Sequence, residues 1–206
     1  MPVTEALNQK QALAAERAVR DRNVNLPNLL TLSRILLIPV FVVLFSTPTA
    51  NRSLAAALVF MIAAVTDMVD GYLARRRSEI TNLGRLLDPI ADKLLILSGL
   101  ILLVQFQRVA AWVAILIIAR EVAVTGIRAI AAAEGFSLPV ETMGKYKMTA
   151  QVIAIVLLIL GGVTPDAWNL QLIGTIILYV ALALGLTSGG RHMVTFWQEI
   201  ALRRLS

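Results

Sequence analysis

Two pairs of carboxylates interrupt an otherwise apolar part of the chain. Asp67 and Asp70 are three residues apart, and Asp88 and Asp92 follow with a spacing of four. On helices, these spacings place the two members of each pair on one face. Carboxylates without His or Cys partners suit hard cations such as Mg²⁺ or Mn²⁺, and two such ions would balance the charge. The pattern predicts a metal site for phosphoryl transfer, with a nucleotide monophosphate as leaving group.

The same carboxylates allow two other interpretations. They could form structural ion pairs with nearby arginines, or they could line a proton or cation path in a transporter. A lone Asp in a membrane helix would favour such a role, whereas the clustering of the Asp residues favours metal binding. The sequence shows no internal repeat that would support a transporter. The neighbouring arginines are Arg75, Arg76, Arg77 and Arg85.

The composition indicates a membrane protein. Of its 206 residues, 58% are hydrophobic, and there are no cysteines and one histidine. The mean hydropathy is +0.77, well above that of ordinary soluble domains. Disulfides, thiolate metal sites and His-rich metal sites are therefore excluded. The net charge of +6 is spread between apolar segments, which predicts contact with membrane lipids and phosphorylated substrates, and no nucleic-acid partner.

Six apolar segments have about the length of a membrane helix. We therefore expect an all-α, polytopic membrane protein with about six transmembrane helices. Residues 1–24 form a polar N-terminal segment with a weak amphipathic pattern, expected in the cytoplasm or on the membrane surface, and residues 25–206 form one membrane domain. The apolar segments cover residues 29–45, 53–69, 86–106, 111–133, 148–163 and 170–186.

The distribution of basic residues predicts the orientation. Most of the 19 Lys and Arg residues lie in the N-terminal segment, after the second and fourth apolar segments, or at the C-terminus. Arg52 and Arg108 mark the opposite side. Because basic residues concentrate on the cytoplasmic side of a membrane, we expect both termini and the acidic residues to face the cytoplasm at the cell membrane.

The acidic residues belong to a longer pattern, DxxDGxxAR, eight residues, then GxxxDxxxD. This pattern resembles the signature of the CDP-alcohol phosphatidyltransferase family, and the resemblance covers the chain from about residue 25. It implies a metal-dependent transferase of phospholipid biosynthesis that moves a phosphatidyl group from a CDP-linked lipid to an alcohol. The matching residues are Asp67, Asp70, Gly71, Ala74, Arg75, Gly84, Asp88 and Asp92.

The resemblance also implies a role for each of these residues. Asp67, Asp70 and Asp88 would be ligands of Mg²⁺ or Mn²⁺, with two ions expected. Asp92 would touch a metal and act as general base on the attacking hydroxyl, for which it must be oriented mainly toward the acceptor. The remaining motif residues would bind CDP-diacylglycerol, and Arg75 would supply charge to its pyrophosphate.

A segment near the start of the membrane domain resembles the phosphatidylglycerophosphate synthase branch of the family. In it, Asn28, Thr31 and Arg34 recur every three residues, so on a helix they would share a face that could bind the phosphate or ribose of the CDP-lipid. A capped helix start with an arginine snorkelling toward water would explain the same residues.

Three basic residues are candidates for the acceptor's phosphate. Arg120 lies beside Glu121 inside an apolar segment, and Lys145 and Lys147 precede another. Arg120 could instead form a structural ion pair, and the lysines could mark the cytoplasmic side. Together with the branch resemblance, the cations favour sn-glycerol 3-phosphate as acceptor. The products would be phosphatidylglycerophosphate and CMP. Inositol phosphate, or phosphatidylglycerol in cardiolipin synthesis, are the alternatives.

Two further expectations concern the C-terminal part and assembly. His192 stands where many relatives would have a tyrosine, and we expect it to lie in solvent or to cap the last helix, without a catalytic role. Small residues suited to helix contacts allow a homodimer, which the family resemblance favours.

Overall fold

The computed structural model describes residues 26–77, 82–136, 138, 143–165 and 168–205. Its regular elements are helices throughout this part of the chain, which confirms the all-α prediction. The N-terminal segment 1–24 lies outside the described residues. In chain order the helices are α2 (Leu26–Phe45), α3 (Ala50–Arg77), α4 (Asn82–Gln105), α5 (Ala111–Ala133), α6 (Met143–Gly161) and α7 (Leu170–Leu205).

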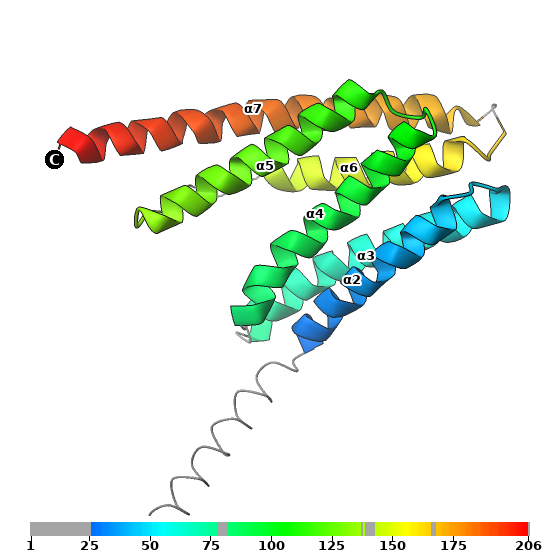
Figure 1. The fold of residues 1–206 in the computed structure, drawn as a ribbon, viewed down its shortest axis with the longest axis horizontal. Coiled ribbons are helices and arrows are strands. Elements are labelled where there is room, and N and C mark those ends of the chain that lie inside the picture. Colours follow the sequence, from blue (N-terminus) through cyan, green and yellow to red (C-terminus); the bar gives the residue numbers. More distant parts are fainter. Residues whose placement is uncertain (1–25, 78–81, 137, 139–142, 166–167, 206) are drawn as a thin grey trace, which may run out of the picture.

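The helices form two groups that share one core. The chain runs back and forth, so successive helices are joined at alternating ends (Figure 1). Helix α2 packs on α3 and α4, while α7 packs on α5 and α6. Contacts of α6 with α3 and α4 join the two groups. This topology brings the start of α6 and the middle of α5 together beside α7.

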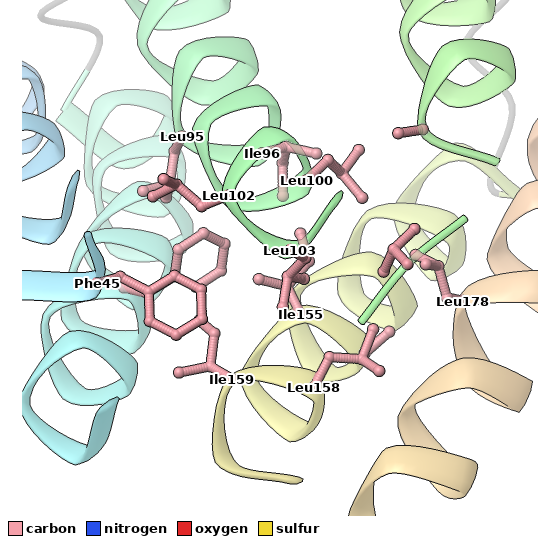
Figure 2. Packing of buried hydrophobic residues seen from close by; sticks show 14 of the residues in the cluster. Phe45, Leu95, Ile96, Leu100, Leu102, Leu103, Ile155, Leu158, Ile159 and Leu178 are labelled. Atoms are coloured by element: carbon pink, nitrogen blue, oxygen red, sulfur yellow. The ribbon is translucent and has the colours of Figure 1, made fainter. Parts of the chain in front are cut away.

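The core is made of aliphatic and aromatic side chains at the places where the helices cross. Phe41, Phe45 and Phe60 are fully buried between α2 and α3, and the Phe41 and Phe60 rings lie 5.2 Å apart. Figure 2 shows leucines of α4 meeting Ile155, Leu158 and Ile159 of α6. Because such interiors pack as densely as organic crystals, the helices that carry the functional side chains are held firmly.

Arg108, in the connection between α4 and α5, joins the ends of several helices. Its Nη1 atom donates to the carbonyl oxygens of Leu158 and Ile159, at 3.1 and 2.7 Å, near the end of α6. Its guanidinium lies over the Phe45 ring, 5.4 Å from the centroid. Burial lowers the pKa of Arg108, but a guanidinium remains charged in proteins, so this clamp does not depend on pH.

The last helix differs from the sequence prediction. The apolar segment was expected to end at residue 186, whereas α7 continues to Leu205. A hydropathy pattern detects only the part that is free of charge. The extension is stabilised by packing, since Phe196 lies on Ala131 and Leu138 beyond the middle of α5, and its ring stacks with Phe136 at 6.0 Å.

The expected position of His192 is wrong. Its side chain is 3% exposed, and it lies within α7 and not at a helix cap. Its Nε2 atom is 3.0 Å from Nη2 of Arg128 on α5. The long α7 carries His192 against α5, which explains why it is not in solvent.

Length and composition identify one candidate membrane span among the described residues. This is Leu170–Arg203, and four other helices contain shorter apolar stretches of 10–17 residues. Large apolar side chains are nevertheless exposed on most helices, including Leu36, Val43, Ile115 and Val122. An apolar exterior of this extent is unusual for a monomer in water.

Candidate functional site

The acidic motif lies at the ends of two consecutive helices. Asp67 and Asp70 are in the last part of α3, and Asp88 and Asp92 are in the first part of α4. Only residues 78–81 separate these helices in sequence, so the chain keeps the two acidic segments close together. The surroundings of the motif residues, including Gly71, Ala74, Arg75 and Gly84, are not among those that the structure describes.

The described side chains place a cluster of charges between α5, α6 and α7. Arg120 of α5 and Lys147 of α6 both donate to Oε1 of Glu121; the Arg120 Nη1 distance is 3.0 Å. The side chains of Arg120 and Lys147 are 11% and 7% exposed. Two predicted acceptor cations therefore meet at one carboxylate, and the predicted Arg120–Glu121 ion pair is part of the same arrangement.

Helix α7 holds Arg120 in place. The Nε atom of Arg120 donates to the Gly185 carbonyl oxygen at 2.9 Å, and Nη2 donates to the Ser188 hydroxyl at 3.3 Å. A Cβ atom at Gly189 would lie 3.2 Å from Cγ of Arg120, and one at Gly185 would lie 3.3 Å from Cδ of Lys147. The two glycines thus leave the space that the basic side chains occupy.

These side chains line a small open pocket. Arg120, Glu121, Lys147 and Gln151 supply its polar wall, and apolar residues of α5 and α7 supply the rest. Lys147 belongs to α6, which also packs against α4. Helix α4, whose first half bears Asp92, contacts both helices that carry the charged side chains, α5 and α6.

Arg34, predicted to contact the CDP-lipid, is fully buried. This excludes the alternative in which the side chain snorkels to water, because a snorkelling arginine exposes its guanidinium. Burial of the whole side chain is costly unless its charge is compensated, and Arg34 does have interaction partners. The side chains of Asn28 and Thr31 lie outside the described part.

Three further polar or charged residues, Lys145, Thr125 and Arg128, lie near this cluster in the sequence. The side chain of Lys145 lies outside the described residues, so its place in the acceptor site stays a prediction. Thr125 and Arg128, which follow Glu121 on α5, make separate contacts. Thr125 donates to the backbone oxygen of Glu121 at 2.7 Å, and Arg128 contacts His192.

Four residues of this charged cluster were missed by sequence reasoning or given a lesser role. Gly185, Ser188 and Gly189 contact or accommodate Arg120 from 65 to 69 positions away in the chain. The local run of small residues in α7 could have indicated a close helix contact, but not its partner. Glu121 was considered only as a structural partner of Arg120, and its contact with Lys147 needed the fold.

No group of three or more His, Asp or Glu residues that could hold a metal is found among the side chains that the structure describes. The four motif aspartates lie outside that search, so the predicted ligands are not tested by it. As a donor set they provide only carboxylate oxygen, which fits Mg²⁺ or Mn²⁺.

Two little-exposed cations at an open pocket between apolar helices have the chemistry to bind an anionic group. Residues 24–187 match the family described as CDP-alcohol phosphatidyltransferase. The chain belongs to this family.

Individual relatives support this family membership. A protein of Bacillus subtilis named CDP-diacylglycerol–glycerol-3-phosphate 3-phosphatidyltransferase is 40% identical over 190 residues, covering 85% of this chain and 97% of the relative. Proteins with the same name from Rickettsia bellii and Shigella flexneri serotype 5b are each 40% identical. Both cover 80% of this chain, and 91% and 90% of the respective relative.

Proposed function

We propose that this protein transfers the phosphatidyl group of CDP-diacylglycerol to sn-glycerol 3-phosphate, giving phosphatidylglycerophosphate and CMP. The observation that carries the proposal is the pair of cations with little exposure, Arg120 of α5 and Lys147 of α6, on helices that contact α4, which bears Asp92. An acceptor phosphate bound there would bring its hydroxyl toward the acidic motif. The names of the relatives agree with this acceptor.

The chemistry requires an in-line exchange at phosphorus. The free hydroxyl oxygen of glycerol phosphate forms a bond to the phosphatidyl phosphorus, and the bond from that phosphorus to the CMP oxygen breaks. Asp92 accepts the hydroxyl proton, which makes the oxygen a better nucleophile. CMP leaves with the bonding electrons. The base must be near the acceptor, and the contacts of α4, which bears Asp92, with α5 and α6 support this assignment.

Asp67, Asp70 and Asp88, together with Asp92, would hold Mg²⁺ or Mn²⁺, with two ions expected. When bound, the ions would neutralise the pyrophosphate and the charge that develops on the leaving phosphate. The small side chains of the motif would let the nucleotide approach the backbone closely. CDP-lipid contacts are assigned to Asn28, Thr31, Arg34, Gly71, Ala74, Arg75 and Gly84.

Arg120, Lys145 and Lys147 would bind the acceptor's phosphate. A guanidinium presents paired donors that match phosphate oxygens, and an ammonium adds a compact charge. The fork of Arg120 is oriented by its bonds to Gly185 and Ser188. Such preorganisation lowers the entropic cost of binding the acceptor.

We further propose that the helices cross the cell membrane six times, with both termini and the site on the cytoplasmic side. The exposed apolar side chains on most helices support a lipid environment. The alternating helix ends and the concentration of basic residues support the orientation. The small residues of the chain allow a homodimer in the membrane.

The function is tested by CMP release from the purified protein in detergent, with CDP-diacylglycerol and Mg²⁺ or Mn²⁺. We expect release with sn-glycerol 3-phosphate and not with inositol phosphate or serine. Asp92→Asn should lower kcat at least about a hundredfold, because general-base assistance is lost. Asp166→Asn, in the connection between α6 and α7, is the matched control and should retain activity.

Each other outcome has a defined meaning. Release with a different acceptor would refute the acceptor assignment and keep the family chemistry. Full activity of Asp92→Asn would refute Asp92 as base. Ion flux without any CMP release would replace the transferase function by the transporter alternative.

A further inference from the structure

Glu121 occupies a position that an acceptor phosphate would need. Its Oε1 atom accepts from Nη1 of Arg120 at 3.0 Å and from the ammonium of Lys147. Both donors face the pocket that Glu121 also lines. A carboxylate oxygen and a phosphate oxygen accept the same hydrogen bonds from the same cations. Glu121 therefore resembles the ligand in charge and in acceptor chemistry.

Arg120 is anchored without the help of Glu121. Its Nε and Nη2 atoms are taken by Gly185 and Ser188 of α7, and Gly189 closes on its aliphatic stem. Glu121 takes the remaining terminal nitrogen, Nη1. If Glu121 moved away, the guanidinium would stay in place and present a free donor to the pocket. A carboxylate needed only to position Arg120 would be redundant here.

The charges explain why a carboxylate is present. Arg120 and Lys147 are two cations in a partly buried site. Without an anion their mutual repulsion would be weakly screened, because few water molecules reach them. Glu121 is 21% exposed and lines the open pocket, so its side chain is accessible from that pocket.

We propose that Glu121 is an internal counter-anion that the acceptor phosphate displaces from Lys147 and from Nη1 of Arg120. The inference rests on the proposed function in taking this cluster as the acceptor-phosphate site. Each molecule of acceptor must compete with a carboxylate that is already in place. Glu121 thereby weakens acceptor binding, keeps the empty site charge-balanced, and favours release of the phosphate-bearing product.

The sign of one mutational effect separates this role from a structural one. If Glu121 only bridges α5 and α6, its loss disorders the cations and weakens anion binding. If Glu121 competes with phosphate, Glu121→Gln removes the competing charge while the α7 anchors hold Arg120. Anion affinity then rises. The glutamine keeps the size of the side chain, which limits disturbance of the packing.

The test measures binding of inorganic phosphate by calorimetry and the KM for sn-glycerol 3-phosphate, both in detergent. For Glu121→Gln we expect phosphate to bind about tenfold more tightly and KM to fall about as much, with kcat within about threefold. Glu134→Gln, the same change at an exposed residue after α5, is the matched control and should leave both values unchanged. Raised salt should reduce the difference between Glu121→Gln and the unmodified protein.

Unchanged or weaker phosphate binding by folded Glu121→Gln would overturn the proposal. Should that variant fail to fold, Glu121→Asp decides, because it keeps the charge and withdraws the carboxylate from Lys147. Tighter phosphate binding by Glu121→Asp supports displacement, and equal or weaker binding overturns it. Phosphate binding needs no turnover. Tighter binding by Glu121→Gln in a protein that transfers nothing to glycerol phosphate would thus refute the proposed function and keep the displaceable anion.

Discussion

Two adjacent glycines of α7 provide a test of the proposed acceptor site at the scale of single residues. A Cβ atom at Gly189 would lie 3.2 Å from Cγ and 3.3 Å from Nε of Arg120, whereas one at Gly190 would meet nothing within 4 Å. Gly189→Ala should therefore shift Arg120 by a few tenths of an ångström and weaken its bonds to α7. Loss of about one net hydrogen bond should raise the KM for sn-glycerol 3-phosphate by roughly two- to tenfold.

Gly190→Ala is the matched control, since it makes the same change one position along the same helix. Its kinetic constants should equal those of the unmodified protein. A KM raised equally by both substitutions would mean that helix propensity or flexibility of α7 is responsible, and not the position of Arg120. The KM for CDP-diacylglycerol should stay constant in both variants, because the acceptor site alone is altered.

The residue scale also shows what the sequence could and could not predict. Arg120 and Lys147 stood out because charges inside apolar segments are costly and need a reason. Ser188 is a common residue in an ordinary setting, and its contact with Arg120 spans 68 positions. The buried state of His192 was missed for the same reason, because burial depends on which helix lies alongside.

At the scale of helices, the contact between α6 and α7 depends on Gly174. A Cβ atom there would lie 2.9 Å from Cγ of Leu158 and 3.2 Å from the carbonyl oxygen of Ala154. Gly174→Ala should push the two helices apart and destabilise the protein by about 1–3 kcal/mol. The measurement is the midpoint of thermal unfolding in detergent, which should fall by several degrees, about 4 °C or more.

Gly126→Ala on α5 makes the same change where a Cβ atom meets nothing within 4 Å. Alanine favours the helix over glycine by up to about 1 kcal/mol, so its midpoint should stay the same or rise. A fall for Gly126→Ala as large as that for Gly174→Ala would contradict the role of close α6–α7 packing.

The accuracy of the predicted helix boundaries differs from helix to helix. For α5 the expected range 111–133 agrees with the structure, because Ala110 and Glu134 coincide with the ends of the apolar pattern. For α3 the apolar segment ended at 69, but the helix continues to Arg77. Its last residues are polar and helical at once, and a hydropathy pattern cannot distinguish such residues from a connection.

At the scale of the whole molecule, the alternating helices place Asn51 and Glu134 at opposite ends of the bundle. Asn51 lies in the first turn of α3, and Glu134 follows α5. Both are exposed in the structure. If the predicted orientation is right, the Asn51 end faces outward from the cell and the Glu134 end faces the cytoplasm.

The absence of cysteine from the sequence makes this orientation directly measurable. A membrane-impermeant maleimide should label Asn51→Cys in intact cells and Glu134→Cys only after lysis. The unmodified protein, which has no thiol, provides the blank. In the predicted topology one lipid bilayer separates the two positions. Labelling of Glu134→Cys alone in intact cells would mean that the topology is inverted. Labelling of both variants in intact cells would mean that the two positions do not lie on opposite sides of the membrane. Only the predicted pattern places Arg120, Lys147 and the acidic helices on the side where soluble, phosphorylated acceptors are made and where charged substrates need not cross a bilayer.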